Sequence, residues 1–191
     1  MKGVKLETRE RIMEQMLIHV HRYGRKRTRL VSLAEDLDMS HANIYRHFKN
    51  KTEILDAVVI DWLRSADSLI DEAAAKEQSA AGICTAIVIA LHRFLKWKLE
   101  NEPGAIEVFR HAFSDQPKAV ANHLTGLRLK IGTCVAEHGE KAGEASEKIA
   151  LRLDLLTTVL ESFLNPVQIF ERGSENDEEQ LRLLMALFFA D

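Results

Sequence analysis

The chain has 191 residues, of which 46% are hydrophobic and 29% are charged, and its formal net charge is −3. This composition is ordinary for a globular protein and leans toward helix-forming residues. We expect no sheet, because no alternating apolar and polar run bounded by turn residues stands out. Apolar runs such as Ile87 to Leu91 are far shorter than the roughly 18 residues of a membrane span. Since the charged N-terminus also lacks a signal-peptide core, we expect a cytoplasmic protein with no membrane association.

Charge divides the chain unevenly. Residues 1–51 contain twelve Lys or Arg and six acidic residues, a net charge of +6, so the remaining residues carry −9. A basic segment on an acidic body indicates that one end of the protein meets a polyanion. Chance clustering of the charges is the alternative.

Two cysteines, Cys84 and Cys134, lie in apolar helical stretches without metal-type spacing. We therefore expect both to be buried, reduced thiols. The spacing of four histidines also fits no recognised metal motif; these are His92, His111, His123 and His138. We therefore expect neither a metal nor another cofactor.

Helical periodicity begins near Glu7, and the first predicted helix ends at Gly24. Thr28 is predicted to be the N-cap of a second helix. After a turn at Asp38 and Met39, Ser40 is predicted to cap a third helix that runs to about Phe48.

Asn50 and Glu53 have capping-box spacing and are predicted to open a fourth helix. Its inner face is predicted to hold five apolar residues: Ile54, Leu55, Val58, Trp62 and Leu69. Hydrophobic periodicity predicts further helices over residues 80–100, 105–115, 117–138, 147–164 and 178–190.

The last two of these helices are apolar on more than one face. One face can pack on the core of the domain, but the second also needs cover, because large exposed apolar patches usually mark an interface. Two helices from each of two chains would form a four-helix bundle, so we expect a homodimer through the last two helices. The alternative is a single thick helical core without a partner.

The segment "MSHANIYRHFKNK", residues 39–51, divides cleanly on a helical wheel. Ile44 and Phe48 share the inward face, whereas Ala42, Asn43 and Arg46 face outward. Asn pairs well with adenine, Arg with guanine, and a small Ala admits a thymine methyl group, so the outward face suits a DNA major groove. A polar helix–turn–helix that only packs is the alternative.

Other polar residues are better suited to contact phosphate groups of the DNA backbone, either through their side chains or through the N-terminus of a helix. The predicted phosphate contacts are Tyr45, His47, Lys49, Lys51, Thr28 and Arg29, and the predicted interface also includes Ser40 and His41.

The motif "SLAEDLDMSHANIYRHFKNKTEIL" resembles the N-terminal domain of the TetR family of bacterial transcriptional regulators, and the resemblance covers roughly residues 6–57. Leu33-Ala34, Met39-Ser40 and Ile44-Tyr45 stand at family motif positions, as do His47, Phe48 and Lys51. Asp38 departs from the pattern, because the family usually has Gly at this turn. Asp tolerates the left-handed backbone region better than most residues, so we expect modest strain there.

The resemblance implies an all-α protein of about nine helices, with a helix–turn–helix DNA-binding domain at residues 1–51 and a helical ligand-binding and dimerisation domain at 52–191. It implies a homodimeric repressor that binds a palindromic double-stranded operator and is released by a small-molecule effector. A helical adaptor that acts only through protein partners is the alternative function. We expect no enzyme activity, because no nucleophile or phosphate-loop signature occurs.

The effector is not identified by any motif. Seven residues of the acidic body, mostly aromatic or apolar, could line a pocket for an apolar or aromatic ligand. Ordinary core packing is the alternative for each of them. The seven residues are Phe94, Trp97, Phe109, Phe113, His123, Leu127 and Phe163.

Overall fold

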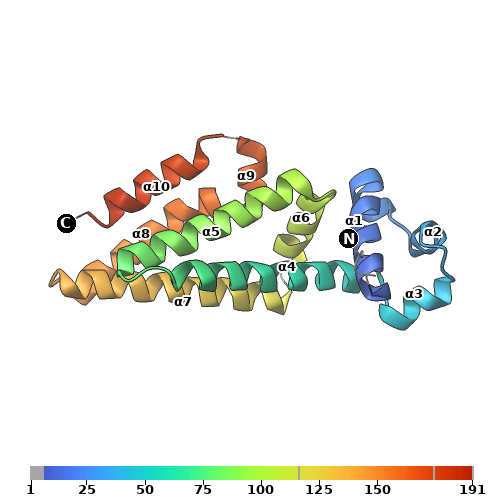
Figure 1. The fold of residues 1–191 in the computed structure, drawn as a ribbon, viewed down its shortest axis with the longest axis horizontal. Coiled ribbons are helices and arrows are strands. Elements are labelled where there is room, and N and C mark those ends of the chain that lie inside the picture. The colour runs from blue at the N-terminus through green and yellow to red at the C-terminus, as the bar shows by residue number, and fades with distance from the viewer. Residues whose placement is uncertain (1–6, 116, 174, 191) are drawn as a thin grey trace.

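The computed structural model describes residues 7–115, 117–173 and 175–190, and within these ranges it contains helices and no strands (Figure 1). The helices are α1 (Thr8–Arg27), α2 (Leu30–Asp36), α3 (His41–His47), α4 (Lys51–Ala74), α5 (Ala80–Asn101), α6 (Ala105–Asp115), α7 (Lys118–Lys141), α8 (Ser146–Leu164), α9 (Pro166–Arg172) and α10 (Asp177–Phe188). The predicted all-α class is therefore confirmed.

The short helix α9 was not predicted, although its end signals are readable in the sequence. The side chain of Asn165 accepts a hydrogen bond from the Val167 amide, and Pro166 occupies the first turn. Gly173 ends the helix with φ of 56°. Asn followed by Pro is a common start signal of a helix, and Gly is a common stop signal.

The molecule is elongated, with a small head at one end and a longer body at the other (Figure 1). Helices α1 to α3 form the head, and α4 runs from it along the body. Helix α5 packs against α4 and α7, while α8 and α10 lie on the side of the body away from the head. Helix α6 stands between the head and the rest of the body, where it contacts both α1 and α4.

The head and the body share one hydrophobic core. Its buried residues include Ile12 and Phe48 of the head, Ile54 and Val58 of α4, and Val108 of α6. A second core holds α5, α7, α8 and α10 together. Because the first core is continuous, a movement of α6 changes the packing of the head as well as that of the body.

The junction between α1 and α2 differs from the prediction. Gly24 has φ of 74°, which produces a kink within α1 rather than its end. Arg29, not Thr28, occupies the N-cap position of α2, and its side chain makes no capping hydrogen bond. Thr28 is buried, and its hydroxyl donates to the Gly24 carbonyl oxygen at 3.0 Å. The predicted N-cap at Thr28 was therefore wrong, because this hydroxyl closes α1 instead.

The turn that precedes α3 follows the prediction. Asp38 has φ of 52°, the only positive value at a non-glycine position among the described residues. Asp is one of the few side chains that adopt this region without large strain. The Ser40 hydroxyl then accepts a hydrogen bond from the Asn43 amide at 3.2 Å, so its predicted capping role is confirmed.

Helix α4 begins at its predicted cap. Asn50 Oδ1 accepts from the Glu53 amide at 2.9 Å, whereas the Glu53 carboxylate reaches the Lys49 amide instead of that of Asn50. Four of the five residues predicted for the inner face are buried. Leu69 is 43% exposed, so its predicted inner position was wrong.

Helix α5 is long and apolar enough to cross a membrane by length and composition alone. Its apolar residues are needed for a different reason, because α5 packs against both α4 and α7. Ile87, Val88 and Leu91 are buried in these contacts. Cys84 of this helix and Cys134 of α7 are buried free thiols in the second core, as predicted.

Candidate nucleic-acid interface

Helix α3 presents a polar surface because one of its residues and the C-cap residue that follows it fasten it to the head. Ile44 is 0% exposed and Phe48 is 1% exposed, and both belong to the shared core. The predicted inward face is therefore confirmed.

The opposite surface of α3 is open to solvent. His41, Ala42, Tyr45 and Arg46 are exposed, and Asn43 is half-buried. The rings of His41 and Tyr45 meet edge to face with centroids 4.7 Å apart, which aligns two hydrogen-bonding side chains along one turn. The wheel assignment of these residues to the outer surface agrees with their exposure, whereas their contacts with DNA stay a prediction.

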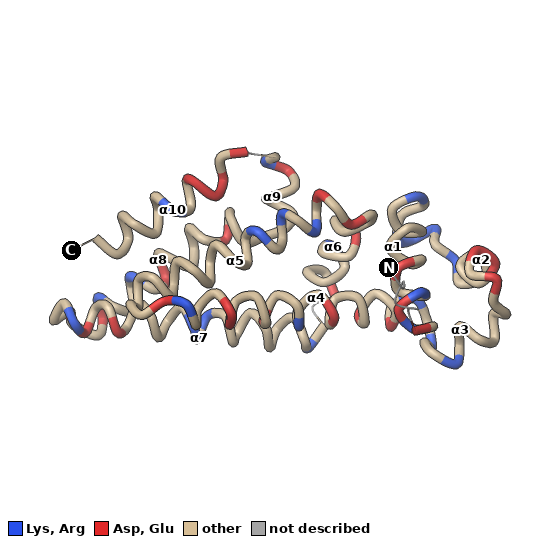
Figure 2. Tube along the Cα trace, viewed as in Figure 1, with Lys and Arg blue, Asp and Glu red and all other residues tan. Residues whose placement is uncertain are grey.

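The head carries exposed cations on α3, just after it and at the start of α2. Arg46, Lys49 and Arg29 are exposed, and within the described chain none of the three forms an ion pair. Basic residues lie at the end of α1 and near α3, whereas α2 is acidic and residues of both signs are spread along the body (Figure 2). A helix with free cations and hydrogen-bonding groups can contact both phosphates and base edges.

Arg9 positions α3, a role that the sequence reading missed. Its Nη1 donates to the His47 carbonyl oxygen at 3.0 Å, and its guanidinium lies 4.0 Å from the centroid of the Phe48 ring. Arg9 therefore holds the C-terminal end of α3 against α1. No local pattern predicts this contact, since it joins residues 38 positions apart in the chain.

Two predicted phosphate ligands are engaged elsewhere. The Lys51 ammonium donates to the carbonyl oxygen of Arg25 at 2.7 Å and approaches that of Thr28 at 3.4 Å. Thr28 itself is only 4% exposed. Lys51 and Thr28 thus stabilise the junction between α1 and α2, which argues against phosphate contacts for both; those contacts stay predictions.

Helices α8 and α10 share an uncovered apolar surface on the body. Leu151 and Leu155 of α8 are 70% and 60% exposed, and Leu183 and Leu187 of α10 are 61% and 67% exposed. Each pair is spaced by four residues, so each forms one stripe on its helix. The two helices contact one another, so the stripes lie on neighbouring elements.

Helix α10 is also fastened to α5 by an ion pair. Arg93 reaches both carboxylate oxygens of Glu178, at 2.6 and 2.7 Å, and Arg182 adds a third contact at 3.0 Å. Hydrogen bonding from Arg93, joined by that from Arg182, lowers the pKa of Glu178 to about 2. This pair keeps the first turn of α10 on the body.

An apolar cavity of about 90 Å³ lies in the body between α4, α5, α6 and α7. Five of the predicted pocket residues line it: Phe94, Phe109, Phe113, His123 and Leu127. His123 supplies the only titratable side chain among the lining residues, and its Nδ1 lies 2.9 Å from Asp67. The cavity adjoins an open groove between α7 and α8, which shares Phe113, Leu124 and Leu127 with it.

Two predicted pocket residues lie elsewhere. Trp97 is 52% exposed and borders a shallow groove between α4 and α5 on the outside of the body. Phe163 is buried in the second core, where the guanidinium of Arg172 lies 4.6 Å from its ring centroid. Neither side chain is among those that line the cavity.

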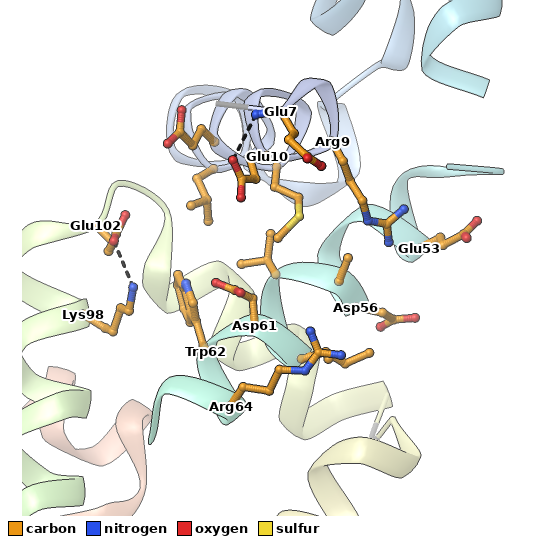
Figure 3. A pocket seen from close by; sticks show the side chains of 16 residues that line it. Glu7, Arg9, Glu10, Glu53, Asp56, Asp61, Trp62, Arg64, Lys98 and Glu102 are labelled. Carbon is orange, nitrogen blue, oxygen red and sulfur yellow. Dashed lines mark hydrogen bonds and ion pairs between the residues drawn. The ribbon is translucent and has the colours of Figure 1, made fainter. Parts of the chain in front are cut away.

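The groove between the head and the body is acidic (Figure 3). Its volume is about 710 Å³, and it lies between α1, the first half of α4 and the end of α5. Glu7, Glu10, Asp61 and Glu102 are among its carboxylates, so it is unsuited to a phosphate backbone. Trp62 lines both this groove and the apolar cavity, which places one indole ring between them.

No protein-family model matches the sequence, and no curated protein matches it closely enough to be recognised as a relative. Solved structures, in contrast, match nearly the whole chain, and most of them are transcriptional regulators of the TetR/AcrR family. A TetR-family transcriptional regulator from Rhodococcus sp. is 16% identical, with a TM-score of 0.70, over 95% of this chain and 98% of that one.

Two further matches show the range of proteins with this fold. The regulator FadR from Bacillus subtilis, solved in complex with stearoyl-CoA, is 13% identical, with a TM-score of 0.66, over 95% of this chain and 97% of that one. The superantigen PfiT is 20% identical, with a TM-score of 0.65, over 94% of each chain. The chain therefore has the TetR fold, and the resemblance found in its N-terminal motif is confirmed at the level of the fold.

Proposed function

We propose that this protein is a DNA-binding transcriptional regulator, which acts as a homodimeric repressor in the cytoplasm. The observation that carries the proposal is the outer surface of α3, where Asn43 and Arg46 stand beside exposed rings and unpaired cations. Asn and Arg are the side chains that pair best with adenine and guanine in the major groove. The +6 charge of residues 1–51 supplies the sequence-independent attraction to the duplex.

The exposed leucines of α8 and α10 support a two-fold dimer. Packing the two helices against their copies buries all four leucine side chains and forms a four-helix bundle. The heads then face the same duplex from two protomers. We therefore expect a palindromic operator, with half-sites about one helical turn or a multiple of it apart.

The apolar cavity supports regulation by a small apolar effector. Its lining offers shape and apolar contact but little charge. At about 90 Å³ it is smaller than the ~300–1,000 Å³ of typical ligand sites, so an effector of ordinary size must displace a wall. The neighbouring groove between α7 and α8 provides the route, and the stearoyl-CoA complex of FadR shows that one protein of this fold takes a long apolar chain.

The proposal is tested by selecting genomic fragments bound by the purified protein and mapping the protected bases. We expect a palindromic motif that changes at one or two positions per half-site in Asn43→Ala or Arg46→Ala. A helical adaptor gives a different result, because it would enrich no motif and would show no salt-dependent binding to any duplex.

A further inference from the structure

The imidazole of His111 lies where the head meets the body. Its side chain is 0% exposed, although it comes from α6, which borders both parts. Nε2 lies 2.8 Å from Oδ1 of Asp56, near the start of α4. Nδ1 lies 2.5 Å from Nη1 of Arg25, at the end of α1, and 2.9 Å from Oδ2 of Asp115 on α6 itself.

The two contacts at Nδ1 require opposite protonation states. A guanidinium only donates hydrogen bonds, so Arg25 needs an unprotonated Nδ1 whose lone pair accepts. A carboxylate only accepts, so Asp115 needs a proton on Nδ1. In both states Nε2–H donates to Asp56. The neutral ring therefore binds Arg25, and the imidazolium binds Asp115.

Protonation also disturbs the second contact of Arg25. Arg25 Nη1 lies 2.9 Å from Oδ2 of Asp115, which is the same oxygen that faces the ring. The imidazolium would take this oxygen and would place a positive charge beside the guanidinium. The Ser114 hydroxyl and Arg25 lower the pKa of Asp115, so this carboxyl stays ionised as the ring titrates.

The surroundings of the ring contain few other charges. Asp56 faces it from α4, Asp115 from α6 and Arg25 from α1. Lys51 is nearby but binds the Arg25 carbonyl oxygen. Among the described residues no other charged side chain forms a hydrogen bond or an ion pair with this ring.

We infer that His111 is a positioning residue for the DNA-reading head, and that its neutral form holds the end of α1 through Arg25. This inference rests on the proposed function. Protonation releases Arg25 from the ring and makes it compete with the ring for Asp115, so the head loses one of its two polar contacts with α6 and the other is weakened. Operator affinity then falls as the pH falls, because the imidazole gains its charge by taking up a proton.

The same helix carries the wall of the apolar cavity. Phe109, Ala112 and Phe113 line the cavity, and His111 lies between them in sequence. An effector that shifts α6 therefore moves His111 relative to Arg25, so a bound effector and a proton act on the same contact.

The test compares operator affinity at about pH 8 and about pH 6 in the wild-type protein and in His111→Asn. The Asn side-chain oxygen accepts from Arg25 at any pH, so the variant lacks the proton-dependent loss. We expect the wild-type protein to lose about fivefold to tenfold more affinity than the variant. The comparison cancels the effect of the other histidines, including His41 and His47, because both proteins contain them.

Two further variants keep the test decisive. Arg25→Gln, at a more exposed site, can still donate to Nδ1 without charge repulsion, so it is expected to reduce the pH-dependent loss even if His111→Asn folds poorly. His138→Asn, on α7 and remote from the head, should retain the wild-type loss. Equal pH dependence in wild-type, His111→Asn and Arg25→Gln proteins would overturn the inference.

A measurement without DNA separates this inference from the proposed function. The ¹⁵N chemical shifts of the His111 ring, assigned by their disappearance in His111→Asn, report which nitrogen is protonated. We expect protonated Nε2 and unprotonated Nδ1 at about pH 8. A proton on Nδ1 at that pH would contradict the Arg25 contact, whereas the expected tautomer in a protein that binds no operator would contradict the proposed function alone.

Discussion

The ammonium group of Lys51 lies 2.7 Å from the backbone carbonyl oxygen of Arg25, and through this contact the first residue of α4 closes the end of α1. The last carbonyl groups of a helix lack partners within it and carry partial negative charge, so a cation there is stabilising. Lys51 therefore connects the head to the helix that runs along the body.

Replacing Lys51 with Met is expected to lower the free energy of unfolding by about 1–3 kcal/mol, because charged hydrogen bonds to α1 are lost. Thermal unfolding without DNA measures the effect. Lys49→Met is the matched control, since Lys49 is exposed, and it should weaken DNA binding with little change in stability. Unchanged stability in Lys51→Met together with weaker DNA binding would return Lys51 to the phosphate role.

Substitutions on the outer surface of α3 are expected to distinguish base contacts from phosphate contacts. Asn43→Ala and Arg46→Ala should each cost about 1–3 kcal/mol on the selected operator, because one bidentate base contact is lost. Tyr45→Ala should instead weaken binding to all sequences by a similar factor. Competition titrations against single-base operator variants measure both effects, and an unaltered preference in both base-contact variants would disprove the assignment of this surface.

The apolar stripes of α8 and α10 are expected to hold the dimer together. Leu155→Asp and Leu187→Asp place a charge within the bundle and should produce monomers, because a buried unpaired charge is costly. Sedimentation velocity measures the association state. Leu69→Asp is the control, since Leu69 is an exposed leucine on α4 and should leave a dimer intact. Dimers in both stripe variants would show that a different surface associates.

Acid is expected to loosen α10. The pKa of Glu178 is lowered from its ordinary value of 4.5 to about 2, so the folded state favours the carboxylate. The stabilisation from Arg93 is therefore complete above the ordinary pKa, declines below it, and is lost as the pH falls through about 2. Arg93→Gln should lower stability by about 0.5–1 kcal/mol near neutral pH, since the pair is largely exposed.

Denaturant unfolding at several pH values measures this difference. The gap between wild-type and Arg93→Gln proteins should narrow as the pH falls towards 2, where half of the Glu178 side chains in the folded wild-type protein are protonated, and should close below that pH. A gap that stays constant across this range would mean that Arg93 stabilises the fold without its ion pair.

Local signals in the sequence predicted local structure well. Ser40 and Asn50 cap α3 and α4 because each side chain bonds a backbone amide three residues ahead. Ile44 and Phe48 are buried because their spacing places both on one helical face. These outcomes depend on neighbours along the chain, and a single sequence contains that information.

Contacts between distant segments could not be predicted in the same way. Lys51 and Arg46 are both basic residues near α3, yet only Lys51 finds carbonyl acceptors, because α1 ends beside it. Trp97 and Phe94 are both aromatic residues of α5, but only Phe94 faces the cavity. The packing of helices against one another decides these differences. Hydrophobic periodicity in the sequence does not specify which side of a broadly apolar helix contacts which neighbouring helix.

The central claim is that α3 reads DNA sequence, and the most direct measurement is an equilibrium titration of the dimer against its selected operator and a scrambled duplex over a range of salt. We expect the operator to bind at least about 10³-fold more tightly than the scrambled duplex at physiological salt. Both affinities should decrease linearly on a logarithmic plot against salt concentration, because bound cations displace counterions. Equal affinity for the two duplexes, or no binding to either at low salt, would contradict the account.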